Sequence, residues 1–110
     1  MAIPVKRQGD ALWFTAPATG LDGVEAQWTL WTGTWAVVTF AGDVATTHLT
    51  GALSKGLTIG EFYGHIGSTQ MKTLLPGKYT VVCQAICASV DYEQEFAHEP
   101  LTIKGAGILA

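Results

Sequence analysis

The two cysteines are the first residues whose chemistry must be considered, because a pair of thiols can form a disulfide or bind a metal. Cys83 and Cys87 lie in the segment KYTVVCQAICASV, which is rich in β-branched residues and predicts a β-strand. Four residues along a strand span about 13 Å, whereas the Cα atoms of a disulfide lie within about 7 Å. We therefore expect two buried free thiols that fill core space, and neither a disulfide nor a shared metal.

The histidines and the familiar catalytic motifs offer no further chemistry. His48, His65 and His98 are widely spaced and form no metal-binding motif, so surface or hydrogen-bonded structural roles are expected. There is no Gly-x-Ser-x-Gly segment, no cysteine beside a plausible base, and no glycine run followed by Lys-Ser or Lys-Thr. We expect no catalytic residue, no metal and no cofactor, so an enzyme is not predicted.

Four carboxylates lie close together in the last fifth of the chain, at Asp91, Glu93, Glu95 and Glu99. On a strand the first three would share one face, where they could bind Ca²⁺ or act as paired carboxylates. The alternative is a solvated hairpin edge, whose like charges deter edge-to-edge aggregation. We favour the solvated edge.

Aromatic side chains carry the strongest functional signal, because the chain has four tryptophans. The predicted strand over Val24–Trp31 alternates, so Trp28 faces the core and Trp31 faces the opposite side. A tight turn at Thr32-Gly33 then places Trp35 beside Trp31 as an exposed pair. Three interpretations stay open: a protein interface, a platform that stacks on sugar rings, or two rings covered by a loop of the same domain.

Short alternating segments separated by glycine, aspartate and proline predict the elements that position these residues. Trp13 and Phe14 are neighbours, so one of them points away from the core unless both sheets enclose that strand. A single short helical turn is expected over 67–75, before the Pro76-Gly77 turn. The expected strands cover Ala11–Ala16, Val24–Trp31, Thr34–Phe40, Val44–Leu49, Leu57–Tyr63, Lys78–Ala88 and about Phe96–Lys104, with a loop over Gly51–Gly56. Seven or eight short strands predict an all-β, antiparallel β-sandwich.

Two features narrow this prediction to an immunoglobulin-like sandwich. Trp28 is a large ring on the apolar face of an early strand, where such cores often hold a tryptophan. Tyr79 follows the Pro76-Gly77 turn at the start of the longest predicted strand. From there its hydroxyl can bond a backbone group upstream, as in a tyrosine corner.

The composition fits one folded domain whose surface is short of charge. Charged residues make up 14% of the 110 residues, against about 25% in ordinary domains. The surface is therefore either covered by partners or rich in threonine and glycine. Lysines and arginines are scattered along a chain of net charge −3, so nucleic-acid binding is not expected. No apolar stretch reaches roughly 18 residues and no signal-peptide layout is seen, so we expect no membrane insertion and synthesis in the cytoplasm.

Apolar segments stand at both ends of the predicted sandwich, which covers residues 8–104. The N-terminal arm over 1–7 contains Ile3 and Val5, and the tail over 105–110 contains Ile108 and Leu109. Such segments either add to a neighbouring subunit or form disordered tails. With Trp31 and Trp35, these four residues are the candidate interface residues.

Turn and core segments spread along the chain carry a resemblance to a known family. They are Gly9-Asp10 before Leu12 and Phe14, then Leu21–Val24, Leu74–Tyr79 and Pro100–Lys104. Together they resemble the small immunoglobulin-like domains of tailed-phage structural proteins, such as the N-terminal domain of baseplate upper proteins. The chain departs from that pattern in its tryptophan content and in the longer region Gly51–Gly67.

The resemblance implies a non-enzymatic virion protein of the tail, baseplate or neck. Such a protein would be made in the host cytoplasm and pack against other phage structural proteins and copies of itself. A head-decoration protein is the nearest alternative. The other alternative is a small carbohydrate-binding module that stacks sugars on Trp31, Trp35 and Tyr63.

Overall fold

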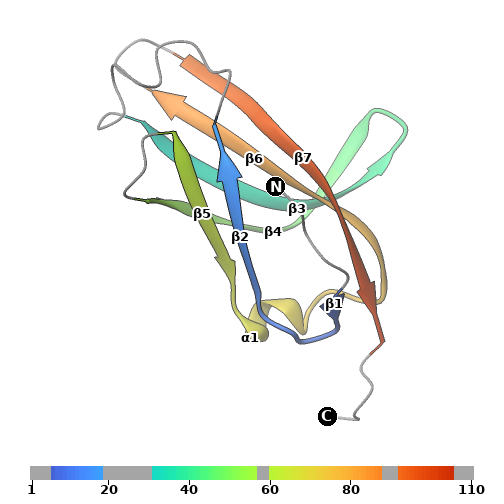
Figure 1. The fold of residues 1–110 in the computed structure, drawn as a ribbon. Coiled ribbons are helices and arrows are strands. Elements are labelled where there is room, and N and C mark those ends of the chain that lie inside the picture. Colours follow the sequence, from blue (N-terminus) through green and yellow to red (C-terminus); the bar gives the residue numbers. More distant parts are fainter. Residues whose placement is uncertain (1–5, 19–30, 57–59, 88–91, 106–110) are drawn as a thin grey trace.

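The fold is built almost entirely from β-strands. A computed structural model describes residues 6–18, 31–56, 60–87 and 92–105 (Figure 1). Its elements are β1 (Lys6–Arg7), β2 (Leu12–Pro17), β3 (Thr32–Ala41), β4 (Val44–Lys55), β5 (Glu61–Ile66), α1 (Ser68–Met71), β6 (Gly77–Cys87) and β7 (Tyr92–Lys104). The all-β prediction is confirmed, and α1 falls inside the predicted helical turn.

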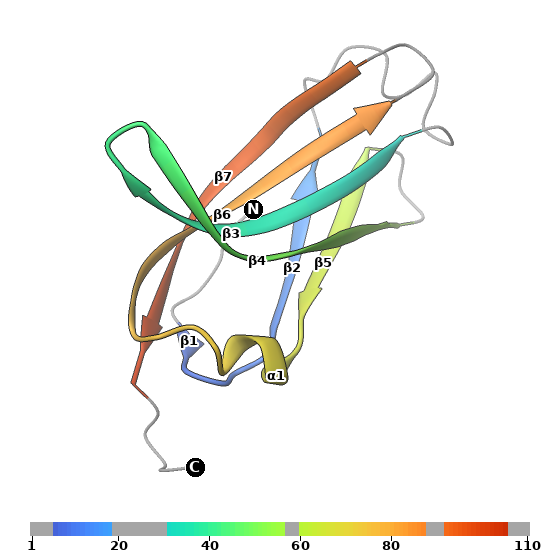
Figure 2. The same cartoon turned by 180° about the vertical axis from the view of Figure 1, so that it is seen from behind.

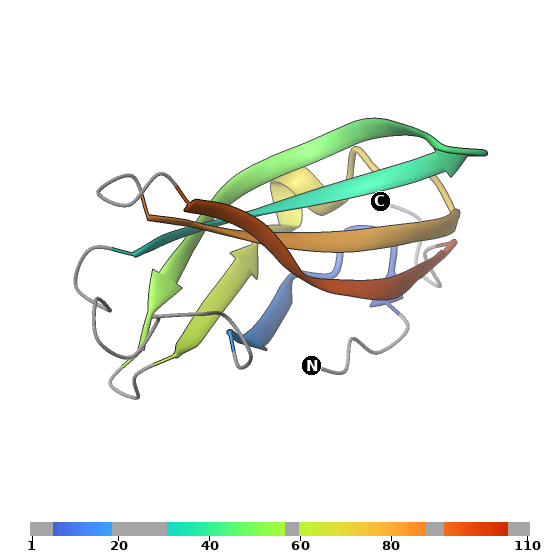
Figure 3. The ribbon, with the colours of Figure 1, turned by 90° about the horizontal axis from the view of Figure 1, so that it is seen from above.

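One seven-stranded sheet folds over on itself to form two layers. The strand order is β1-β7-β6-β3-β4-β5-β2, with β1 parallel to β7 and the other neighbours antiparallel. Strand β4 joins the layers, because it pairs with β3 and then with β5 at Ser54 and Lys55. Figures 2 and 3 show β2 and β5 lying against the face of β3, β6 and β7. The rings of Phe62 on β5 and Phe96 on β7 meet between the layers, with centroids 5.7 Å apart.

The core follows the alternation of the strand sequences, because every second side chain of a strand faces the same way. Cys83 and Cys87 are both buried, as predicted, and neither takes part in a disulfide. Burial, with the Glu99 carboxylate adding to it, raises the pKa of the Cys83 thiol to about 12. At neutral pH this thiol stays protonated and unreactive. The buried residues on β2 and β6 are Leu12, Phe14, Ala16, Val81, Cys83, Ala85 and Cys87.

The predicted turn at Thr32-Gly33 is wrong, and so is the exposed tryptophan pair that it implied. Residues 32–41 form one continuous strand, so Trp31 and Trp35 are four residues apart in an extended segment and point to the same side. Both rings lie in the core, with 1% and 3% of their surface exposed. Trp28, the predicted core tryptophan, lies outside the described residues.

Two glycines within strands make room for these rings. A Cβ atom on Gly51 would lie 2.5 Å from the Trp35 ring, and one on Gly33 would lie 2.9 Å from the Phe62 ring. These glycines therefore serve close packing and do not form turns. The loop predicted over 51–56 is also wrong, because Gly51–Lys55 continues β4.

Only part of the predicted N-terminal arm and C-terminal tail lies within the described residues. Lys6 and Arg7, expected in the N-terminal arm, form β1 and pair with Ile103 and Lys104 of β7. The four candidate interface residues of the arm and tail, Ile3, Val5, Ile108 and Leu109, lie outside the described residues.

The Tyr79 hydroxyl closes the turn before β6, as the tyrosine-corner prediction requires. It donates a hydrogen bond of 2.6 Å to the backbone oxygen of Leu75, across the exposed Pro76-Gly77 turn. The half-buried ring packs against the core. The His48 ring contacts it edge-on, with centroids 5.4 Å apart.

Replacing Tyr79 by Phe removes this hydroxyl and keeps the ring. We expect the free energy of unfolding to fall by about 1 kcal/mol, because one intramolecular hydrogen bond is lost. Urea unfolding of Tyr79→Phe beside the wild type measures the difference. An unchanged stability would show that the hydrogen bond contributes nothing in solution.

Candidate functional site

The outer face of β3, β4, β6 and β7 is hollowed into a groove, called the outer groove below. Two β-bulges shape this groove. His48 is the extra residue on β4 and Phe96 the extra residue on β7, because neither has a partner residue on the neighbouring strand in the register. Each bulge brings side chains three residues apart onto one face and increases the local twist of the sheet. Thr47 and Thr50 thus share the outer face of β4, and Glu95 and His98 share that of β7.

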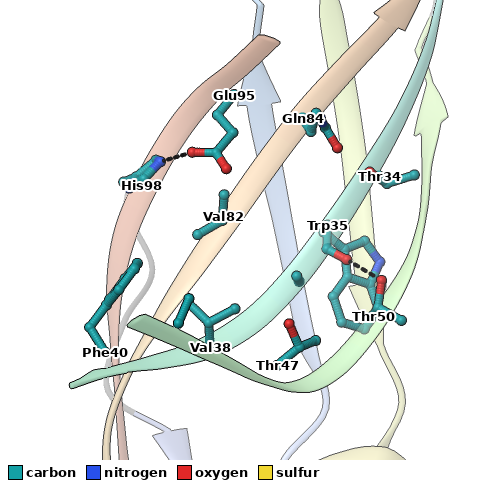
Figure 4. Close-up of a pocket in the computed structure, with 12 residues that line it drawn as sticks. Thr34, Trp35, Val38, Phe40, Thr47, Thr50, Val82, Gln84, Glu95 and His98 are labelled. Carbon is teal, nitrogen blue, oxygen red and sulfur yellow. Dashed lines mark hydrogen bonds and ion pairs between the residues drawn. The ribbon is translucent and has the colours of Figure 1, made fainter. Parts of the chain in front are cut away.

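The floor of the outer groove is apolar and its rim is polar. Ala36, Val38 and Val82 line the groove from β3 and β6. The Phe40 ring stands at one end (Figure 4). The groove has a volume of about 360 Å³. The remaining lining residues are Thr34, Trp35, Ala45, Thr47, Thr50, Gln84, Glu95 and His98. This composition suits contact with an apolar surface bordered by hydrogen-bonding groups.

Three polar side chains of the rim, those of Thr50, Glu95 and His98, have hydrogen-bond partners within the chain. The Thr50 hydroxyl donates a 3.0 Å hydrogen bond to the backbone oxygen of Trp35. The His98 Nε2 and Glu95 Oε2 atoms lie 2.7 Å apart on the surface (Figure 4). These hydrogen bonds reduce the desolvation cost of covering the Thr50, Glu95 and His98 side chains.

The β3–β4 hairpin extends the groove into an exposed apolar tip. Gly42 has φ +64°, which permits the tight Gly42-Asp43 turn. On either side of that turn, Phe40 is 50% and Val44 67% exposed. Figures 1 and 2 show the hairpin projecting beyond the two layers. Because Phe40 also lines the groove, tip and groove form one continuous surface.

No lysine or arginine lines this surface. Within the described part of the chain, the cations that are scattered in the sequence gather where β1, α1, the start of β6 and the end of β7 meet (Figure 1). Five of the six Lys and Arg residues lie there: Lys6, Arg7, Lys72, Lys78 and Lys104. A partner seated on the outer groove therefore buries no ammonium or guanidinium group of this chain.

A second surface, on the outer face of β2 and β5, carries exposed aromatic rings. Trp13 is 71% exposed, whereas its neighbour Phe14 is buried, which confirms that one of the two points outward. The Trp13 and His65 rings stack, with centroids 3.7 Å apart and planes 20° apart. Trp13, Phe14, Thr15 and Tyr63 line a hollow of about 390 Å³.

Among the described histidines and carboxylates that the sequence analysis singled out, His98 and Glu95 meet on the rim of the outer groove. His48 hydrogen-bonds Thr39 at 2.8 Å, while His65 and His98 make the separate contacts described above. Among the residues that the structure describes, no three His, Cys, Asp or Glu side chains are placed to hold a metal ion. The described carboxylates of the acidic segment are Glu93 and Glu95, both exposed, and Glu99, which is half-buried; Asp91 lies outside the described residues.

Sequence reasoning missed Phe40 and Val44, which were assigned only to strands. The signal was present, because Gly42-Asp43 is flanked on both sides by apolar residues that a hairpin tip exposes. Bulges at His48 and Phe96 left no comparable signal. They depend on pairing between distant strands.

Comparisons with known proteins identify no family. No family model matches the chain, and no curated protein matches it. Among solved structures, it is similar to an uncharacterized protein from Bacillus anthracis str. Ames, with 18% identity and a TM-score of 0.47, over 94% of this chain and 79% of that one. In the described ranges, no helix is long and apolar enough to span a membrane.

Proposed function

We propose that this chain is a non-enzymatic structural subunit that packs against copies of itself and other structural proteins through the outer groove and the hairpin tip. The sequence resemblance to immunoglobulin-like domains of tailed-phage proteins makes the tail, baseplate or neck of a virion the expected setting. The low content of charged residues supports a surface covered by neighbours.

We also propose that the fold is an immunoglobulin-like sandwich. It is supported by the strand order β1-β7-β6-β3-β4-β5-β2, with the long β4 passing from one layer to the other. It is also supported by the Tyr79 hydroxyl, which bonds the backbone before β6 as a tyrosine corner does.

The observation that carries the proposed function is the exposed Phe40 ring standing beside an open apolar groove. Large aromatic rings supply much of the binding energy at protein interfaces. In a two-fold pair, the same patch meets itself. A second copy can then place its Phe40 against the floor of this groove while offering its own groove in return.

A double variant of the hairpin tip tests the proposed packing. Phe40→Ser/Val44→Ser removes the exposed apolar side chains and leaves the buried core untouched. In sedimentation velocity, the wild type is expected to form oligomers as its concentration rises, while the double variant stays monomeric. Its thermal midpoint should change by less than about 3 °C, as for surface positions.

Leu75→Ser is the matched control, because Leu75 is 71% exposed but lies outside the groove and the hairpin. This variant is expected to associate like the wild type. A wild type that remains monomeric, or a double variant that associates equally well, would contradict the proposal. If the chain is a virion subunit, it should also co-sediment with particles of the phage that encodes it, and its absence from purified particles would exclude that setting.

A further inference from the structure

The outer face of β2 and β5 presents two aromatic rings on either side of a hollow, remote from the hairpin tip. In the strand register, Trp13 lies opposite His65 and Thr15 lies opposite Tyr63. The side chains of Trp13, Thr15 and Tyr63 therefore share one face. Trp13 is 71% and Tyr63 38% exposed, and together with Phe14 and Thr15 they line the hollow of about 390 Å³. This site is called the Trp13–Tyr63 hollow below.

Both rings are held in place before any ligand arrives. One face of the Trp13 indole is covered by the His65 imidazole, which stacks on it at 3.7 Å. The Tyr63 ring lies so close over Gly56 that a Cβ atom there would collide with it. The Tyr63 hydroxyl is hydrogen-bonded to the Glu61 side chain, and this raises the pKa of Tyr63. Fixed rings lose little conformational entropy on binding.

The Trp13 and Tyr63 rings do not fill the core of the fold. Phe14 and Phe62, the inward neighbours of Trp13 and Tyr63, are buried at 6% and 0% exposure. The outward rings instead occupy positions that ordinary strands fill with polar residues. An aromatic pair that is exposed, fixed in orientation and separated by a hollow indicates a ligand.

The chemistry around the rings identifies the class of ligand. An indole face accepts the C–H groups on the flat side of a pyranose ring. Hydroxyls of the sugar can meet the Thr15 hydroxyl, which lines the hollow between the two rings. No lysine or arginine lines the hollow, so an acidic sugar or a phosphate would meet no opposite charge.

We propose that the Trp13–Tyr63 hollow binds a neutral carbohydrate, with one pyranose ring stacked on the open face of the Trp13 indole. The site lies on β2 and β5 and shares no lining residue with the outer groove. Glycan binding is therefore a second activity, independent of packing between subunits. Of the sugar platform expected on Trp31, Trp35 and Tyr63, this site keeps Tyr63, whereas Trp31 and Trp35 are buried.

Titration of the full chain with neutral hexasaccharides of glucan, xylan, mannan and chitin tests this proposal. Binding is read from the indole N–H signals in a two-dimensional NMR spectrum and from calorimetry. At least one saccharide is expected to bind with a Kd of about 1 mM or tighter. Its titration should shift the indole signal that disappears in Trp13→Ala.

Three variants separate the contributions. Trp13→Ala should weaken binding about tenfold or more, and Tyr63→Ala by a smaller factor. Phe40→Ser removes an exposed aromatic ring of the outer groove, and this variant should bind the saccharide as the wild type does. No binding by any of the four saccharides at about 10 mM, or equal binding by Trp13→Ala, would overturn the proposal. Loss of subunit association in Trp13→Ala, without saccharide binding, would make the hollow a protein contact instead.

Discussion

Replacing Trp35 by Ala is expected to lower the free energy of unfolding by about 3–5 kcal/mol. The ring is 97% buried, and it fills the space above Gly51 on the neighbouring strand. Alanine would leave a cavity there, because the backbone of β3 is held by β4 on one side and by β6 on the other. For a domain of this size the thermal midpoint should fall by more than about 10 °C.

Trp13→Ala is the matched control, since it makes the same chemical change on a ring that is 71% exposed. Its free energy of unfolding should change by less than about 1 kcal/mol. Circular dichroism during thermal and urea unfolding measures both variants. If Trp35→Ala kept the wild-type midpoint, the ring would not be a core residue, and an exposed role for it would have to be reconsidered.

A methyl group added at Gly64 is the second change with a large expected effect. Gly64 on β5 lies opposite Phe14 on β2. Its missing side chain leaves space for the Phe14 ring, since a Cβ atom would lie 2.1 Å from Cζ of that ring. Gly64→Ala therefore forces Phe14 out of its position, and we expect a loss of about 1–3 kcal/mol of stability from overpacking.

Gly105→Ala provides the comparison, because a Cβ atom at Gly105 meets nothing within 4 Å. That variant should unfold at the wild-type urea concentration, within error. Equal stability of both variants would mean that β2 and β5 do not pack as closely as described.

The parts of the fold that local alternation determines could be predicted from the sequence. In β6 the inward series that includes Cys83 and Cys87 follows directly from a period of two. The tyrosine corner at Tyr79 could be predicted because a Pro-Gly turn, a tyrosine and a long strand follow one another. Each of these features depends on neighbours in the chain.

Features set by distant strands could not be predicted in this way. Gly33 is typical of a turn in the sequence, yet it lies within β3 because the Phe62 ring of β5 needs its space. Because of this single difference, Trp31 and Trp35 lie in the core and do not form the predicted exposed pair.

The candidate surfaces show the same limit. The outer groove owes its shape to bulges at His48 and Phe96, which shift the pairing of β4 and β7 with their neighbours. The sequence predicted that either Trp13 or Phe14 faces outward, but not which of the two. The stacking of Trp13 on His65 arises from the β2–β5 register, which joins residues 52 positions apart.

Shielding of the hairpin tip in concentrated protein is the most direct test of the packing function. A fluorophore attached to Val44→Cys labels one site, because the native thiols are buried. A trace of labelled protein is mixed with increasing amounts of the wild type, and quenching of the dye by iodide is measured, with Leu75→Cys as the exposed control. We predict that quenching at position 44 falls as oligomers form, while quenching at position 75 stays constant. A dye at position 44 that remains equally open to iodide at every concentration would contradict the claim that this tip packs against another copy.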